Sequence, residues 1–176
     1  MKTLLCSMIL AAGLASTAQA ATLTAPVALA TPTGPGAPVG TVTISDGPSG
    51  AILTTDLHGL PPGVHGFHVH AMGSCAAAPD KTTGKIVPAG AAGGHMDPSM
   101  SGKHEGPMGM GHLGDLPALT VAADGTAKES LAAPHISSVA ALKGHALMIH
   151  AGGDNYSDAP APLGGGGARI ACGVIG

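Results

Sequence analysis

Aromatic side chains are almost missing from this 176-residue chain, which has no Trp, one Phe and one Tyr. Since aromatic residues bury the most area each, the core has to be filled by Val, Ile, Leu, Ala and Met. A covalent cross-link or a bound metal ion would help such a chain to stay folded. There is also no basic run, and 7 Lys and Arg face 10 Asp and Glu, a formal net charge of −3. The composition therefore argues against nucleic acid as a partner.

Long apolar segments are missing too. The apolar run over residues 4–14 is too short to span a bilayer, and no later segment approaches the necessary length, so no membrane span is expected. Lys2 precedes this run and the small-residue site "AQA" at 18–20 follows it, which is the pattern of a cleaved secretory signal peptide. We expect a signal peptide over 1–20 and one exported domain over 21–176, located in a bacterial periplasm.

Cysteine is scarce. Of the three cysteines, Cys6 falls in the predicted signal peptide, so that Cys75 and Cys172 remain. In an oxidising compartment an isolated pair most simply forms one disulfide, with two free thiols as the alternative. A bridge here would close a loop of nearly a hundred residues, which stabilises the fold by about 4 kcal/mol in the chain-entropy model.

No convincing helical period occurs, apart from a possible turn near 136–144. Short alternating or β-branched runs recur between Gly and Pro residues, and the run at 117–133 contains the hairpin signal Asp124-Gly125. About eight strands are expected, two of them within that run; the segments are 21–30, 38–46, 50–60, 63–71, 117–133, 145–151 and 168–176. The pattern predicts an all-β antiparallel sandwich or barrel. Whether residues 21–36 form a full first strand is left open.

Two stretches interrupt the strand pattern, and we name them the first loop (residues 72–116) and the second loop (residues 152–167). The first loop contains three histidines, and the second is rich in Gly and Pro. Loops of this length inside a compact domain are usually functional or disordered. A flexible linker would not need the three histidines, so we expect the first loop to carry a site.

The sequence "GFHVH" places His68 and His70 two residues apart on a predicted strand. Side chains two apart share a strand face, so both imidazoles can reach one metal ion, whereas His65 has the other parity and is expected to be structural. Alone this is a weak signal. Three further histidines stand singly and are interpreted as surface residues: His58, His135 and His145.

The combination of ligand types carries more weight than any single motif. Three imidazoles and one carboxylate within 21 residues suit tetrahedral Zn(II): His95, His104, His112 and Asp115. Three histidines on apparent strands suit copper, which favours imidazole nitrogen: His68, His70 and His150. The sequence thus predicts two neighbouring metal sites.

Successive motifs follow one another in the stretch from about residue 37 to the C-terminus: "GFHVH", "AAGGHMDP", "KHEGP", "GHLGDLPAL", "LMIHAGGDNYSD" and "GGGGARIACGVIG". In this order they resemble the motifs of copper/zinc superoxide dismutases of the bacterial periplasmic type. The resemblance implies an eight-stranded Greek-key barrel with two long functional loops. It also implies an intramolecular disulfide between Cys75 and Cys172.

The resemblance further implies a role for each motif residue. Copper would be bound by His68, His70 and His150, and zinc by His104, His112 and Asp115. His95 would bridge the two ions, and Asp154 would hydrogen-bond ligand histidines of both sites. Arg169 would stand beside the copper and, with His95, would serve the dismutation of superoxide to oxygen and hydrogen peroxide by Cu(II)/Cu(I) cycling.

Some features leave alternatives open. The family's bacterial members commonly have "GPWG" at a subunit contact, whereas this chain has Met108 in "GPMG", so monomer and homodimer both remain. The methionines of the first loop either help to capture Cu(I) or, as we favour, fill gaps left by aromatics; they are Met96, Met100, Met108 and Met110. A non-catalytic copper- and zinc-binding protein is the alternative function, and a structural adhesion sandwich would leave the histidines unexplained.

Overall fold

The computed structural model describes residues 21–176, and in that range the chain consists of β-strands, loops and short 3-10 turns, with no α-helix. Seven strands form one antiparallel sheet in the order β5-β10-β11-β1-β2-β3-β9. Their bounds are β1 (Thr22–Thr31), β2 (Gly34–Gly47), β3 (Gly50–Leu57), β5 (Phe67–His70), β9 (Ser130–Ala133), β10 (Ala146–His150) and β11 (Arg169–Val174). The sheet therefore places the last strand beside the first, as in a Greek key.

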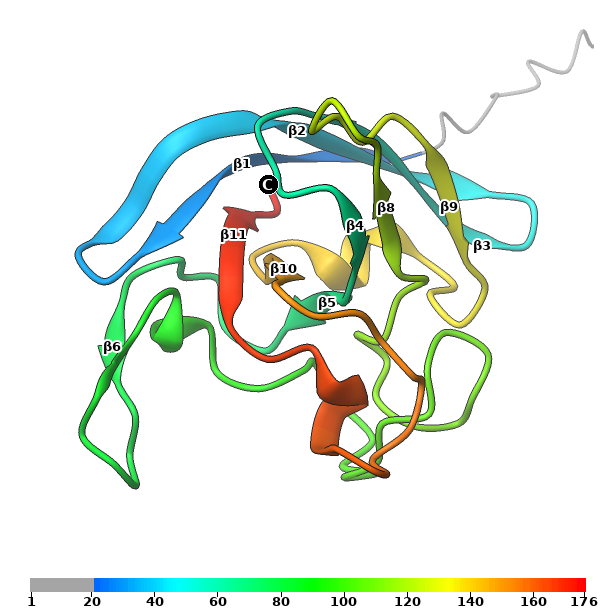
Figure 1. The fold of residues 1–176 in the computed structure, drawn as a ribbon. Helices are drawn as coiled ribbons and strands as arrows, with labels where there is room; N and C mark the ends of the chain where they lie inside the picture. The colour runs from blue at the N-terminus through cyan, green and yellow to red at the C-terminus, as the bar shows by residue number, and fades with distance from the viewer. Residues whose placement is uncertain (1–20) are drawn as a thin grey trace, which may run out of the picture.

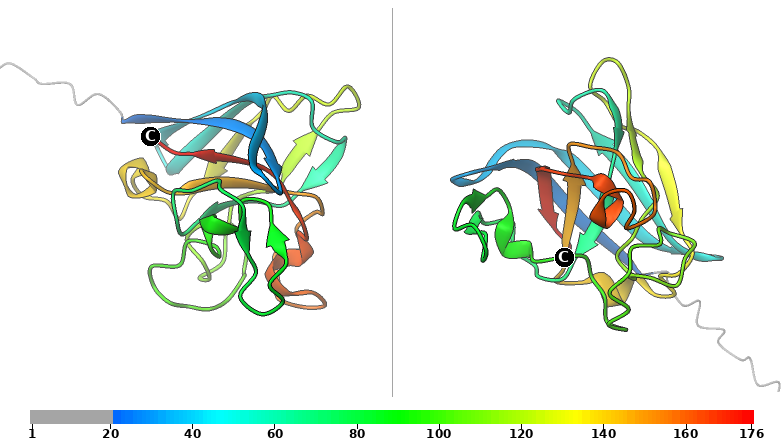
Figure 2. Two further views of the ribbon diagram at one scale, coloured as in Figure 1. Left: turned by 90° about the vertical axis from the view of Figure 1, so that its left-hand side faces the viewer. Right: turned by 60° about the horizontal axis from the view of Figure 1, so that its bottom comes forward.

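A second strand pair closes the sheet into a barrel. Strand β4 (Gly63–His65) pairs with β8 (Leu119–Val121). β4 leads into β5 through Gly66, while β8 is connected to β9 by the turn at Asp124-Gly125. The strands consequently curl around one interior, as Figures 1 and 2 show. The expected all-β Greek-key barrel is confirmed.

Some elements differ in detail from those expected. The predicted strand 63–71 is interrupted at Gly66, whose N–H donates to Gly152 O at 2.7 Å instead of to a strand partner. The first strand is complete, because β1 pairs with β2 on one side and β11 on the other. Short elements occur in the predicted loops and turn: β6 (Ala78–Pro79), β7 (Ile86–Val87), η1 (Gly90–Ala92), η2 (Val139–Leu142) and η3 (Pro162–Gly165).

The predicted signal peptide, residues 1–20, lies outside the described residues. Within 21–176, none of the helical turns has the length and apolar character needed to cross a membrane.

Strand alternation decides where the histidines lie. On β5, Phe67 and Val69 belong to the hydrophobic core inside the barrel, so that His68 and His70 project from its outer face. All four residues are nevertheless buried, and so are all five of β10. The first and second loops cover this outer face; they run below β5 and β10 in Figure 1, in green and in orange. The site is thus enclosed between barrel and loops.

Candidate metal centre

Three histidines from β5 and β10 meet on the outer face of the barrel, each held by a hydrogen bond at one ring nitrogen. His70 Nδ1 donates to Gly93 O at 2.8 Å, and His150 Nδ1 donates to Gly167 O at 3.1 Å. Because a carbonyl can only accept, each ring keeps its proton on Nδ1 and leaves Nε2 with a lone pair. These two Nε2 atoms are 3.3 Å apart. His68 is held through Nε2, which leaves its buried Nδ1 without any partner.

His95, in the first loop, joins this group to a second one. Its ring stacks on that of His68 with centroids 4.0 Å apart. Its Nδ1 faces Asp115 Oδ1 at 2.8 Å, so Nε2 is the nitrogen left for the strand histidines. Ligand atoms of His68, His70, His95 and His150 all lie within 4.8 Å of one another. Four convergent imidazoles suit copper.

The second group consists of His95, His104, His112 and Asp115, whose ligand atoms also lie within 4.8 Å of one another. His104 Nδ1 and His112 Nδ1 are 2.9 and 3.3 Å from carboxylate oxygens of Asp115. Both nitrogens are nevertheless buried without a hydrogen-bond partner. Buried orphan nitrogens around one carboxylate are what a tetrahedral zinc ion satisfies, and the residues therefore fit that metal.

Asp154, in the second loop, connects the two groups. Its Oδ2 accepts from His68 Nε2 and its Oδ1 from His104 Nε2, both at 2.7 Å, and its side chain is fully buried. These bonds fix which nitrogen of each ring faces the metal position. The structure thus brings together every predicted metal ligand, with Asp154 between the groups as expected.

Burial lowers the pKa of three of these imidazoles, those of His70, His95 and His150, and favours their neutral form. Burial first, then the positive fields of His95 and Arg169, lowers the pKa of His70 to about 2. Burial, followed by the field of His68, lowers the pKa of His150 to about 3. For His95, burial lowers the pKa to about 4 against the opposing hydrogen bond to Asp115. Neutral imidazole is the form that binds a metal ion.

The zinc side is electrostatically different, because two carboxylates face His104. Burial works to lower the pKa of His104, but the carboxylates of Asp115 and Asp154, 2.9 and 2.7 Å from its ring nitrogens, outweigh it and raise the pKa to about 9. In Asp115 and Asp154 burial would raise the pKa, but hydrogen bonds from the histidines hold it well below the usual range. Both carboxylates are therefore ionised and supply negative charge to a divalent cation.

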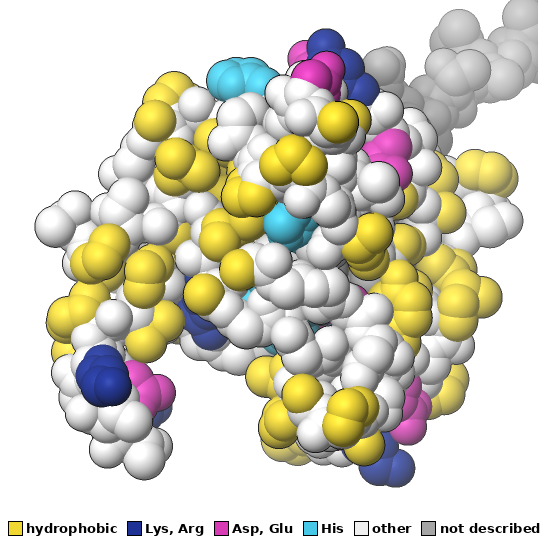
Figure 3. Space-filling model, viewed as in Figure 1, with side chains coloured by type: hydrophobic (Ala, Val, Ile, Leu, Met, Phe, Trp, Pro, Cys, Tyr) yellow, Lys and Arg dark blue, Asp and Glu magenta, His cyan; other side chains and the backbone are white. Residues whose placement is uncertain are grey.

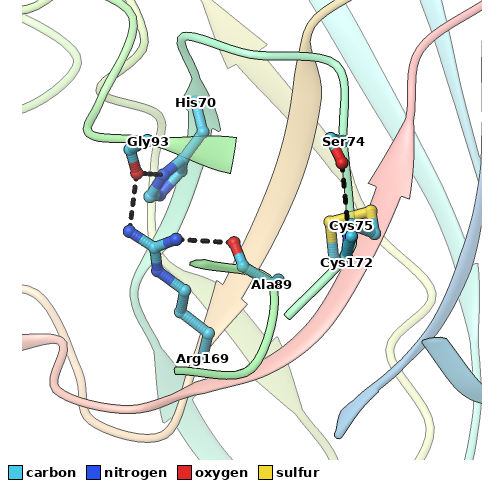
Figure 4. Close-up of a disulfide and its surroundings, with 8 residues drawn as sticks. His70, Ser74, Cys75, Ala89, Gly93, Arg169 and Cys172 are labelled. Atoms are coloured by element: carbon cyan, nitrogen blue, oxygen red, sulfur yellow. Dashed lines mark hydrogen bonds between the residues drawn. A yellow bond between two sulfur atoms is a disulfide. The ribbon is translucent and has the colours of Figure 1, made fainter. Parts of the chain in front are cut away.

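Arg169 lies at the start of β11, beside the strand histidines. Its guanidinium donates to Ala89 O at 2.7 Å and to Gly93 O at 2.6 Å. Gly93 O thereby accepts from both His70 and Arg169, as Figure 4 shows. Sequence analysis did not identify this carbonyl, or that of Gly167, because every residue has a backbone carbonyl and only the fold selects these two.

Cys75 and Cys172 form the expected disulfide, with their Cα atoms 5.7 Å apart. It joins the start of the first loop to β11, three residues beyond Arg169 (Figure 4). The backbone that carries Arg169 is thus covalently linked to the segment that follows His70.

Two cavities of about 270 Å³ each meet at Arg169. One is lined by His70, His95 and His150 together with Leu163 of the second loop. The other lies against β6 and β7 and includes Lys81. The space-filling view shows this face hollowed beside the β6–β7 hairpin, with a basic side chain inside the hollow (Figure 3). An anion can therefore approach the strand histidines past a positive charge.

Several histidines and methionines lie away from this centre. His65 is buried, with ring nitrogens 2.8 Å from His150 O and from Pro61 O, in agreement with a structural role. His58 and His135 are exposed and His145 is half-buried. Met96 packs in the core as gap-filling predicts. For three other methionines that prediction is wrong, because exposed side chains fill no gap; Met100, Met108 and Met110 are 88%, 75% and 82% exposed.

The outer face of this barrel carries two groups of metal ligands that share one histidine. This arrangement places the chain among proteins with a two-metal centre. The family model for copper/zinc superoxide dismutase matches residues 39–175. A superoxide dismutase [Cu-Zn] of Brucella abortus is 58% identical over 146 residues, 83% of each chain. This chain belongs to the copper/zinc superoxide dismutase family. Its reaction is the dismutation of superoxide, and its cofactors are copper and zinc.

Solved structures agree with this membership. The Cu/Zn superoxide dismutase from Brucella abortus superimposes with a TM-score of 0.86 at 54% identity, covering 89% of this chain and 100% of that one. The solution structure of the monomeric copper, zinc superoxide dismutase from Salmonella enterica has a TM-score of 0.78 at 54% identity and the same coverage.

Proposed function

We propose that the two ligand groups divide between the metals by donor type. Copper takes the all-nitrogen group, through His68 Nδ1 and the Nε2 atoms of His70, His95 and His150. Zinc takes the group that includes a carboxylate, through His95, His104, His112 and Asp115. The observation that carries this assignment is the shared His95 ring, which belongs to both groups and has one nitrogen directed to each. Asp154 orients His68 and His104 from behind.

The residues around the copper position have separate tasks in the reaction. Bound copper supplies a one-electron redox couple that accepts an electron from one superoxide and returns it to another. Arg169 attracts the anion and orients it, since a guanidinium remains charged and donates in a fixed fork. His95 Nε2 would hold a proton for the peroxide product whenever it is not bound to copper. Zinc performs no redox step and holds His95 and the first loop in place.

Arg169 separates catalysis from mere metal storage, because storage does not need a cation beside the copper position. We expect Arg169→Ala to retain both metals while its superoxide turnover falls by about tenfold or more, since steering of a charged substrate contributes factors of this order. Metal analysis and activity measured on the same samples provide the test. If wild-type protein that contains both metals shows no superoxide turnover, the catalytic function is refuted. Unchanged activity in the variant would refute the role of Arg169.

We also infer export to the periplasm after cleavage behind Ala20, and a monomer or homodimer in solution. The signal pattern of residues 1–20 and the bacterial origin of the relatives support export. The presence of Met108 where the family commonly has an interface tryptophan, and the monomeric Salmonella relative, favour the monomer. Mass spectrometry of the exported protein and light scattering after size exclusion test the two points.

A further inference from the structure

The second loop contacts the first loop through every other residue of the sequence "DNYSD" at 154–158. Asp154 bonds His68 and His104, as described above. Tyr156 and Asp158, which no role above includes, also reach across to the first loop or to the segment that follows it. Asn155 and Ser157, by contrast, form their side-chain hydrogen bonds within the second loop.

Asp158 holds the backbone of His104. Its Oδ2 accepts from His104 N–H at 2.9 Å, and its Oδ1 accepts from Leu163 N–H at 3.0 Å. The His104 ring is held by Asp154, so this residue is fixed both at its ring and at its backbone. Leu163 also lines the cavity beside the copper-side histidines. One carboxylate thus connects the zinc-side backbone to the wall of that cavity.

Tyr156, the chain's single tyrosine, forms the second connection. Its hydroxyl accepts from Ala118 N–H at 3.0 Å, and its own N–H donates to Asp154 Oδ1 at 2.7 Å. The ring lies directly over Gly106, where an added Cβ would be 2.7 Å from three atoms of the Tyr156 side chain. Tyr156 therefore orients the Asp154 carboxylate and covers the segment just after His104.

Gly164 shows how closely the second loop approaches the centre. It has a φ of +71°, which favours glycine, and an added Cβ would overlap Asp154 Oδ1 and lie 2.8 Å from His104 Nε2. The turn that contains Gly164 is anchored by the bond from Leu163 N–H to Asp158. The second loop therefore packs directly against the Asp154–His104 contact, and the hydrogen bond to Asp158 keeps its turn in that position.

From this geometry we infer that Tyr156 and Asp158 are positioning residues for the zinc side of the centre. They act through His104 and Asp154 and slow the release of zinc. Neither side chain hydrogen-bonds a strand histidine, so their removal loosens His104 first, and zinc is lost while copper is retained. The inference rests on the assignment of zinc to the group that contains His104.

The test uses the enzyme loaded with copper and zinc, as wild type, Asp158→Asn and Tyr156→Phe. Each variant preserves side-chain size and removes an acceptor. After exposure to EDTA, protein-bound copper and zinc are followed over time by elemental analysis. Changes to the partners of metal ligands typically cost 10–100-fold in affinity, so we expect zinc loss to accelerate about tenfold for Asp158→Asn and by a smaller factor for Tyr156→Phe. Copper loss should remain at the wild-type rate.

A spectroscopic measurement separates positioning from general loosening of the fold. With cobalt(II) in place of zinc, visible absorption reports ligand geometry, and we expect its bands to shift in both variants. The control Asn155→Ala alters side-chain bonds only within the same loop, and Asp124→Asn removes a carboxylate in a distant hairpin where it accepts only from Thr126. Both controls should resemble wild type.

Three results would overturn the inference. The first is zinc retention and cobalt spectra in both variants that equal those of wild type. The second is parallel loss of zinc and copper with a lowered melting temperature, which would mean a role in fold stability alone. The third is the same effect in Asn155→Ala. Wild-type enzyme that contains no zinc would instead refute the metal assignment on which the inference rests.

Discussion

The two halves of the metal centre are supported in different ways. On the side that we assign to copper, His68, His70 and His150 belong to paired strands, and β5 and β10 are hydrogen-bonded along their length. On the side that we assign to zinc, His104, His112 and Asp115 lie in residues 101–116 of the first loop, which form turns and no strand. The copper-side side chains are oriented by a ladder that belongs to the barrel, whereas His104 is held by Asp154 and Asp158 of the second loop.

This difference suggests which half is pre-formed. Strand pairing and the core below it maintain the copper-side geometry whether or not metal is bound. The zinc-side geometry collects two carboxylates around His104, and their mutual repulsion is offset only by a cation, either a proton on the histidine or the metal. We therefore expect bound zinc to contribute to the order of the first loop, and the site that we assign to copper to be formed without metal.

Removal of a strand ligand should have the largest effect, and it tests whether the two halves of the centre are supported independently. We expect His150→Ala to lose copper and to show no measurable superoxide turnover, while zinc remains bound, because His150 has no contact with Asp154 or with the carboxylate of Asp115. Elemental analysis and an activity assay on one preparation test this. Loss of zinc together with copper would show that the two halves are not independently supported.

Opening the disulfide should have a large effect on stability and a smaller one on activity. Replacement of Cys75 and Cys172 by Ser removes a link across 97 residues, which costs about 4 kcal/mol of unfolding free energy in the chain-entropy model. Denaturant unfolding of the metal-loaded protein measures this. We also expect Arg169 to be held less firmly, which lowers activity while both metals remain. An unchanged midpoint would contradict the expected cross-link contribution.

A fall in pH should weaken zinc binding more than copper binding, and this is the smallest of the expected differences. In the metal-free protein the pKa of His104 is raised to about 9, so below that pH zinc has to displace a proton, and its affinity should fall about tenfold per pH unit. The pKa values of His70 and His150 are lowered to about 2 and 3, so these rings carry no competing proton at neutral pH. Titration of each metal between pH 8 and 5 should show a steeper pH dependence for zinc; equal slopes would contradict the difference.

Much of the fold could be predicted from the sequence because its signals are local. Alternation of apolar residues indicated the strands, and Asp124-Gly125 indicated the turn that connects β8 to β9, although these strands pair with β4 and β3 and not with each other. The break at Gly66 escaped prediction, since it arises from a bond to Gly152, far along the chain. The short β6–β7 hairpin escaped as well, because neither strand exceeds two residues and no periodicity can appear over so few.

The metal-site residues were predictable by type and resemblance, but their partners were not. Imidazole and carboxylate are chemically distinctive, so His68, His95 and Asp115 can be recognised as candidate metal ligands from the sequence alone. Carbonyl acceptors such as Gly93 O are not distinctive, because every residue has one. The contacts of Tyr156 and Asp158 were not predicted either, since an exposed tyrosine or aspartate in a Gly-rich loop usually contacts only solvent.

The sequence by itself determined which side chains can bind metal and on which face of β5 two of them lie, because side-chain chemistry and the strand repeat of two are properties of the local chain. It also predicted a bridge between Cys75 and Cys172, which the structure contains. Only the tertiary structure decided which nitrogen of each ring is free to bind a metal and which carbonyls accept from His70 and Arg169. It also decided how the second loop hydrogen-bonds His104. These depend on groups distant in the sequence, and their meeting is set by closure of the barrel and the packing of both loops on its outer face.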